Sequence, residues 1–149
     1  MVKDFRKGIV GLEEKMKSIP GAFRPEHYDT KHEFADGLYL RQVIVPKGHL
    51  FVTKLHKKAH PLFIMKGKIS ILTEDGVKTV EAPWYTITKA GTKRVIYVHE
   101  EVIGLTVHAT EETDLDKIED EVIAKDYAEF DQFLDQQEAY KLLEIMEEK

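Results

Sequence analysis

The sequence predicts a mainly β domain, an antiparallel sandwich or barrel, preceded by a short helix and followed by a helical tail. Between Leu38 and Thr110, short runs of β-branched and aromatic residues are separated by turns that contain glycine or proline. These runs recur roughly every eight to twelve residues, a spacing typical of antiparallel sandwiches and barrels. After Thr110 the composition becomes acidic and favours helices.

The length and composition predict one domain. The chain has 149 residues, 42% of them hydrophobic, which is enough for one core and too little for a second independent one. We divide the chain into an N-terminal helical or loop extension (1–37), a barrel (38–110) and an acidic helical tail (111–149).

A short amphipathic helix is expected at the N-terminus. Apolar residues recur there at spacings of four and three, which places them on one helix face: Phe5, Ile9, Leu12, Met16 and Ile19. Pro20 and Gly21 then end the helix. Because the segment is short and carries both charge signs, we expect this face to pack on the main body of the protein.

The expected strands occupy residues 38–45, 49–56, 61–67, 68–73, 76–82, 85–91, 94–98 and 102–108. A Glu-Asp-Gly sequence at 74–76 predicts one hairpin turn. A second hairpin is expected around 99–101, where 94–98 would pair with 102–108. One face of that hairpin then carries Arg94, Ile96, Val98, Val102, Gly104, Thr106 and His108. The opposite face is apolar and would pack against outer layers or a partner subunit: Val95, Tyr97, Ile103, Leu105 and Val107.

The segment after Thr110 is expected to be helical. Thr113 and Asp114 are candidate caps for a helix over 115–124. Later helical turns are marked by Phe130, Phe133, Leu134, Leu142, Ile145 and Met146. The acidic residues between them predict a solvated helix face rather than paired catalytic carboxylates.

The composition excludes several functional classes. The chain contains no cysteine, so disulfides, thiolate metal sites and cysteine nucleophiles are excluded. The net charge of −5 with both signs interspersed gives no basic stripe for nucleic acid. No run approaches the roughly 18 apolar residues of a membrane-spanning helix, and the start lacks a secretory signal pattern. We expect a cytoplasmic protein that binds neither nucleic acid nor membrane.

Two histidines lie on either side of a short Lys-Lys-Ala turn. His56 would end one strand and His60 would begin the next. Their even separation across a tight turn is compatible with both side chains on one face, inside a polar pocket. His27, His32, His49 and His99 are expected in loops or at sheet edges.

The segment around these two histidines resembles the first motif of the cupin superfamily, in which a glycine, two histidines, a glutamate and a closing glycine follow one another. Gly48 and Gly67 stand at the glycine positions. Lys54 stands at the first histidine position, His56 at the second and His60 at the position of the glutamate.

The second cupin motif places a histidine after a Pro-x-Gly turn, and residues 89–94 resemble it. Lys89 replaces the proline and Arg94 replaces the histidine. The chain is also similar to cupin-like proteins encoded by tailed bacteriophages, which implies a place in the virion or in the infected host cytoplasm. The resemblance implies a double-stranded β-helix barrel, or jelly roll, over 38–108, and a homodimer.

The residues of the expected pocket suggest two kinds of site. His56, His60 and His108 could form a facial site for a divalent transition metal such as Zn, Fe, Ni, Cu or Mn. Arg94 suits an anion, because its planar guanidinium contacts a carboxylate or phosphate in a bidentate way. Lys54 and Arg41 are further candidate ligand-binding residues. Their positive charges oppose a metal cation, so anion binding without a metal is an open alternative.

Three functions are compatible with these residues. The first is a small-ligand-binding cupin whose cationic, histidine-lined pocket takes an anionic metabolite, sugar or nucleotide derivative, with or without a metal. The second is a metal-dependent isomerase, lyase or dioxygenase, whose catalytic residues the sequence does not identify. The third is a structural or assembly module, of phage type, that binds partners through its helices. In the absence of a pocket, the histidines would be partly exposed residues at the barrel rim.

Overall fold

Two long strands form the centre of the fold in this computed structural model, which describes residues 2–18, 28–73 and 75–148. They are β5 (His60–Thr73) and β8 (Val95–Ala109), and they pair antiparallel along most of their length. Both bend where the pairing register shifts, between Ile64 and Ile69 of β5. Long, bent strands of this kind let one sheet curl towards a barrel.

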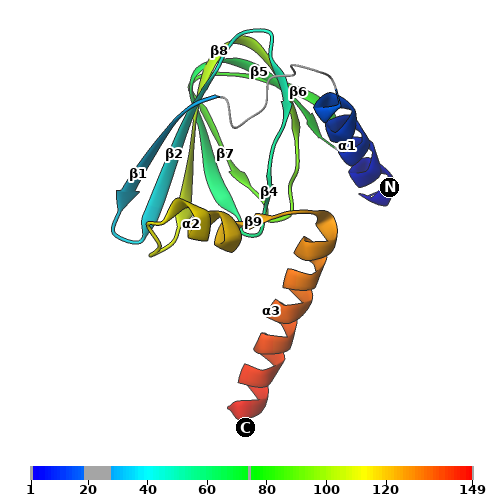
Figure 1. Cartoon of the computed structure of the whole chain (residues 1–149), viewed down its shortest axis with the longest axis vertical. Helices are drawn as coiled ribbons and strands as arrows, with labels where there is room; N and C mark the ends of the chain where they lie inside the picture. The colour runs from blue at the N-terminus through cyan, green and yellow to red at the C-terminus, as the bar shows by residue number, and fades with distance from the viewer. Residues whose placement is uncertain (1, 19–27, 74, 149) are drawn as a thin grey trace.

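The remaining strands extend this pair into a seven-stranded sheet with the order β1-β2-β8-β5-β6. In addition, β3 pairs with β8 and β7 pairs with β5. The strand bounds are β1 (Asp29–Ala35), β2 (Leu38–Val45), β3 (Leu50–Val52), β6 (Gly76–Glu81) and β7 (Trp84–Thr88). A second, two-stranded sheet joins β4 (Leu55–His56) to β9 (Ile123–Ala124). The prediction of a mainly β, antiparallel barrel is confirmed (Figure 1).

The main core lies inside the curled sheet, where residues of alternating strand positions meet. Its largest fully buried members are Val45, Ile69 and Val98, from three different strands. The residues next to these core positions in the sequence point to the other face of the sheet, because successive side chains of a strand point to opposite faces. The core therefore fixes which residues of β2, β5 and β8 face inwards.

The N-terminal helix, α1 (Val2–Lys17), packs on the outside of the barrel as the apolar spacing predicts. Ile9 is buried against Val52 and Val95, and Lys93 forms an ion pair with Glu13 at 2.8 Å. The predicted helix end at Ile19, Pro20 and Gly21 lies outside the described residues.

The predicted hairpin around residues 99–101 is wrong, because β8 continues through them without a turn. Its long partner β5 holds both halves extended, and Glu100 pairs with Lys68 at the bend. The predicted faces are nevertheless retained, because Val102 follows Val98 by four positions and residues an even number of positions apart on a strand share a face. Arg94, Thr106 and His108 accordingly share the inner side.

Other boundaries also differ from the expected strands. The segment 29–35, expected within the helical or loop extension, forms the edge strand β1 paired with β2. Segments 61–67 and 68–73 merge into β5, and 49–56 divides into β3 and β4. β5 and β6 pair as the predicted hairpin requires, with Thr73 opposite Gly76, although residue 74 lies outside the described residues. Tertiary pairing, which the sequence pattern does not contain, decides these limits.

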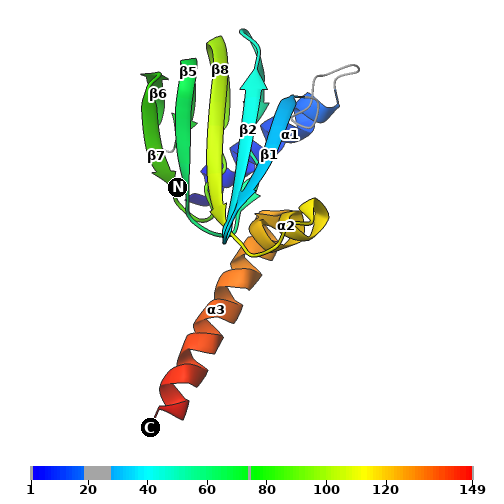
Figure 2. The same ribbon diagram turned by 90° about the vertical axis from the view of Figure 1, so that its left-hand side faces the viewer.

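The acidic tail forms two helices. Asp114 caps α2 (Leu115–Val122) by accepting hydrogen bonds from the backbone N–H groups of Asp116 and Lys117. This short helix lies across one end of the barrel, whereas α3 (Tyr127–Glu147) projects away from it (Figures 1 and 2). Phe130 is the buried side chain of α3. In the described part of the chain, no helix combines the length and apolar character needed to cross a membrane.

A substitution at Gly67, the closing glycine of the first motif, tests how closely the backbones approach at the bend in the sheet. Its φ is +97°, and a Cβ there would lie 2.8 Å from Cα of Val102 and 2.9 Å from the carbonyl oxygen of Glu100. We expect Gly67→Ala to lower the free energy of unfolding by roughly 3 kcal/mol or more, because backbone strain and a backbone clash add.

Gly48 provides the matched control in urea denaturation. Its φ is +85°, but a Cβ would meet nothing within 4 Å, so Gly48→Ala is expected to cost only about 1 kcal/mol. Equal losses for the two variants would contradict a close backbone approach at Gly67.

Candidate functional site

A cavity of about 550 Å³ lies inside the barrel and is bordered at one end by α2. Along β2 its lining changes from Tyr39 and Arg41 to Val43 and Val45. The polar groups are therefore gathered towards the end of β2 at which Tyr39 pairs with His108. Such a cavity, largely apolar with a few convergent polar groups, is typical of a small-molecule site.

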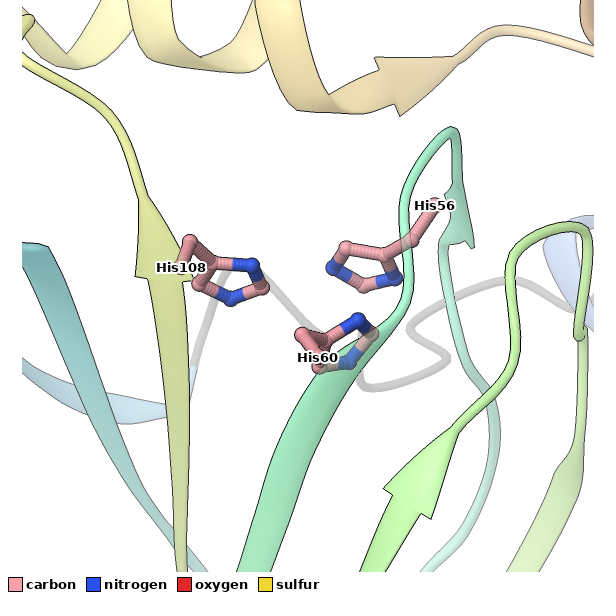
Figure 3. Close-up of side chains that lie close together, drawn as sticks. All are labelled: His56, His60 and His108. Atoms are coloured by element: carbon pink, nitrogen blue, oxygen red, sulfur yellow. The ribbon is translucent and has the colours of Figure 1, made fainter.

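Three histidines meet at the polar end of this cavity (Figure 3). His56 ends β4, His60 begins β5, and His108 lies near the end of β8. Their ring centroids are 4.2 Å apart for His56 and His60, 4.6 Å for His60 and His108, and 5.2 Å for His56 and His108. Each ring offers one nitrogen that lies within 4.8 Å of the others.

Burial keeps the three rings neutral at neutral pH. Burial is the largest cause, and together with the charges of His60 and His108 it lowers the pKa of His56 to about 3. Burial likewise lowers the pKa of His108 to about 4, with smaller contributions from His60 and Arg41. The pKa of His60 is also lowered by burial, against a hydrogen bond to the backbone of Lys58. A neutral imidazole is the form that binds metals.

Hydrogen bonds orient two of the rings. Nδ1 of His60 lies 3.3 Å from the carbonyl oxygen of Lys58. Because a carbonyl only accepts, the neutral ring carries its proton on Nδ1 and leaves Nε2 free for a ligand. Nε2 of His108 lies 2.9 Å from Oγ1 of Thr106, so Nδ1 is its free nitrogen. Such outer contacts commonly orient metal-binding histidines.

The three histidines fit a divalent transition metal in residue type, protonation and proximity. Metal–nitrogen distances of about 2.0–2.1 Å bring ligand nitrogens to roughly 3 Å from one another, so modest ring movements from the present spacing are required. Three neutral nitrogens leave further coordination positions for water or a ligand.

Two arginines line the same cavity. Arg94 donates a hydrogen bond from Nη1 to Oγ1 of Thr88 at 3.1 Å, and burial lowers its pKa. Arg41 faces inwards from β2. Among the described residues, neither guanidinium forms an ion pair with a carboxylate. A guanidinium group carries a positive charge in proteins.

Lys54, the other candidate cation, lies at the cavity mouth with its charge already paired. Its Nζ is 2.7 Å from Oε1 of Glu119 on α2. Both side chains are about half exposed, so the pair contributes little to stability. The structure therefore brings His56, His60, His108, Arg94 and Arg41 around one space, and places Lys54 at its edge.

Sequence reasoning missed Tyr39, His32 and the contribution of α2. The hydroxyl of Tyr39 is 2.7 Å from Nδ1 of His32, and the Tyr39 ring stacks on His108 with centroids 5.7 Å apart. Alternation along β2 places Tyr39 on the face of Arg41 and was a usable signal. No sequence pattern indicates that Ile118 and Glu119 of the tail line the cavity.

Comparisons with known proteins concern the fold. No family model matches the chain, and no curated protein matches it. Ectoine synthase from P. lautus aligns with a TM-score of 0.53 and 10% identity, covering 73% of this chain and 82% of that chain. The chain has a cupin fold. A cupin-2 domain protein from Shewanella frigidimarina has a TM-score of 0.47 and 13% identity, with 66% of this chain and 92% of that chain covered.

In this cupin barrel, His108 joins the site from a position outside both expected motifs. The first motif supplies His56 and His60, and the second supplies Arg94. His108 pairs with Tyr39 across β2 and β8, so the sheet itself brings it to the other two rings. The resulting cluster contains three histidines and no carboxylate.

The protonation state of the cluster predicts a pH dependence of stability. The pKa values of His56 and His108 are lower in the folded protein than the ordinary value of about 6.5 in the unfolded chain. The unfolded chain therefore binds more protons below about pH 6.5, and stability falls as the pH falls. Between pH 6.5 and 4 each of these two histidines contributes a loss of roughly 2.5–3 kcal/mol, so we expect a total loss on the order of 5 kcal/mol, measured by urea denaturation.

Replacing His56 and His108 together by glutamine should flatten this slope. His99→Gln is the control, because His99 does not line the cavity and its replacement leaves the rings of His56, His60 and His108 in place. An unchanged slope in the double variant would contradict neutral, buried rings at the site.

Proposed function

We propose that this cupin binds a small anionic metabolite in the barrel cavity, together with a divalent transition metal held by His56, His60 and His108. The observation that supports this most strongly is that three neutral imidazoles line one cavity together with two guanidinium groups that form no ion pair with a carboxylate of the described residues. When bound, the metal supplies Lewis acidity and an attachment point for a ligand oxygen.

The charges favour joint binding of metal and anion. Arg41 and Arg94 repel a metal cation, and the three rings bring no negative charge to offset it. An anionic ligand neutralises both the guanidinium groups and the metal, so each partner is expected to strengthen the binding of the other. Joint binding of an anion therefore offsets the repulsion between the two arginines and the metal cation.

Metal titration tests the proposal directly. Untagged protein is expected to bind one equivalent of Co²⁺ or Zn²⁺, followed by Co²⁺ absorption and calorimetry. Because the pKa values of His56 and His108 are about 3 and 4, protons compete weakly and binding should persist at pH 5.5.

Single-residue variants locate the metal. His56→Ala, His60→Ala and His108→Ala should each weaken metal binding by at least about 100-fold, since each removes a ligand. Nε2 of His99 lies 2.6 Å from Oγ of Ser70, outside the cavity. His99→Ala should therefore bind the metal as the wild type does. Less than about a tenth of an equivalent of metal in the wild type, with or without anions, would contradict the metal part of the proposal.

A second candidate function, assembly through α3, is favoured by the exposed end of this helix. Tyr140 and Met146 are 63% and 71% exposed, and Leu142, Leu143 and Ile145 are also exposed. An isolated helix gains little stability in water without a packed face. We propose that a second copy of the chain covers this apolar end in a homodimer.

Truncation tests this second function. Deleting residues 137–149 should convert a dimer into a monomer in native mass spectrometry and sedimentation, without loss of the barrel. The double variant Leu142→Glu and Ile145→Glu should have the same effect, because buried charges oppose association. Glu138→Gln and Glu147→Gln together serve as a control on the same helix. A truncated chain with the full-length assembly state would contradict a role for α3.

A further inference from the structure

The lining of the cavity changes from polar to apolar in successive rows across β2 and β8. The first two rows, next to the histidine cluster, contain polar side chains. The next two rows contain only valine and glycine. From the polar end inwards, the pairs of residues that lie opposite each other are Tyr39 and His108, Arg41 and Thr106, Val43 and Gly104, and Val45 and Val102.

The other walls of the barrel follow the same division. Nη1 of Arg94 donates a hydrogen bond to Oγ1 of Thr88 at 3.1 Å, and Thr88 lies opposite His60, so this guanidinium belongs to the polar end. On β5, Ile64 lies opposite Gly104 in the apolar rows. The groups that could hold a metal or an anionic group are therefore at one end, and the rest of a ligand would lie against the apolar rows.

The free surface of the apolar lining is on the side of the histidine cluster that faces away from α2. Where α2 crosses the polar end, Ile118 and Val122 are buried against Tyr39. Val43 and Leu62, by contrast, line the cavity and are only partly buried. The apolar rows of β2, β8 and β5 therefore offer a surface on which the body of a ligand can be buried.

Gly104 provides part of the space between these rows. A Cβ at this position would lie 3.8 Å from both Cδ1 of Ile64 and Cγ1 of Val43, which is an ordinary van der Waals distance. The strand would therefore accept a larger residue, but its side chain would extend into the cavity that Gly104 lines. The glycine thus keeps open a gap between Val43 and Ile64.

The hydroxyl groups that line the apolar half of the cavity already have hydrogen-bond partners. Oγ1 of Thr30 donates a hydrogen bond to the carbonyl oxygen of Tyr28 at 2.9 Å. The hydroxyl of Tyr28 lies 3.3 Å from Nδ1 of His49. An aliphatic or aromatic group gains free energy when it is buried in such surroundings, whereas the hydroxyls of a sugar would lose hydrogen bonds to water.

From this arrangement we infer that the ligand is an amphiphilic organic anion, with its charged head at the polar end and an aliphatic or aromatic body in the apolar half. The inference rests on the proposed function, because it names the ligand class of the same cavity. It goes further in selecting an apolar body over a sugar or nucleotide, and in assigning Gly104 as the residue that sets how large this body can be.

Calorimetry with a series of carboxylates tests the inference on the full-length protein loaded with Zn²⁺. The probes are acetate, butanoate, hexanoate and octanoate. We expect the affinity to rise roughly two- to fourfold for each added CH₂ group until the apolar half is filled. Gluconate has the carbon number of hexanoate but carries hydroxyl groups along its chain, and it should bind at least about tenfold more weakly than hexanoate.

A variant at Gly104 tests where the body of the ligand lies. Gly104→Val should lower the ratio of octanoate to acetate affinity at least about tenfold, because the new side chain occupies the space of several CH₂ groups. Leu105→Val is the matched control, because Leu105 is the next residue of β8, points to the other face and does not line the cavity. If circular dichroism shows that Gly104→Val does not fold, Gly104→Ala adds one methyl group and should lower the same ratio about threefold.

The outcomes separate this inference from the function on which it rests. Equal affinity for acetate, hexanoate and octanoate, with Zn²⁺ still bound, would overturn the inference and leave the anion-binding function standing. Gluconate binding as tightly as hexanoate, or a ratio unchanged in Gly104→Val, would also overturn it. Absence of both Zn²⁺ and carboxylate binding would overturn the proposed function itself.

Discussion

The pairing of β5 with β8 is the constraint on which the rest of the structure depends. Leu62 lies opposite Thr106, and His60 and His108 each stand two residues beyond that pair on their own strand. Because alternate residues of a strand share a face, both histidines point to the inner side. A shift of one residue in the register of either strand would turn the histidine of that strand to the outside and separate the two rings.

The histidine cluster is stable because its rings are neutral. Burial holds the pKa values of His56 and His108 at about 3 and 4. The nearby guanidinium groups therefore face uncharged imidazole rings at neutral pH and are not repelled by like charges. Among the described side chains, no buried polar atom lacks a hydrogen-bond partner. Among the described cavity residues, Lys54 is paired with Glu119, and Arg41 and Arg94 carry positive charge without a carboxylate partner, which favours anionic ligands.

The tail connects the site to the rest of the molecule. Ile118 and Val122 of α2 pack on Tyr39, and β9 pairs with the strand that carries His56. Nζ of Lys57 donates a hydrogen bond to the carbonyl oxygen of Asp120 on α2 at 2.8 Å, which adds a contact between α2 and the turn that follows His56. Residues far apart in sequence thus form the end wall of the cavity, although α3 continues away from the barrel (Figure 2).

The sequence by itself determined the class of the fold, the helix α1, the cap at Asp114, and the pairing of His56 and His60 with Arg94 as site candidates. These depend on local periodicity and turn chemistry, which short stretches of sequence contain. Tertiary structure alone decided that β8 runs through 99–101, that residues 29–35 form a strand, and that Tyr39 and Glu119 border the cavity. Such features depend on pairing between distant segments, and their energies come from contacts that no local pattern encodes.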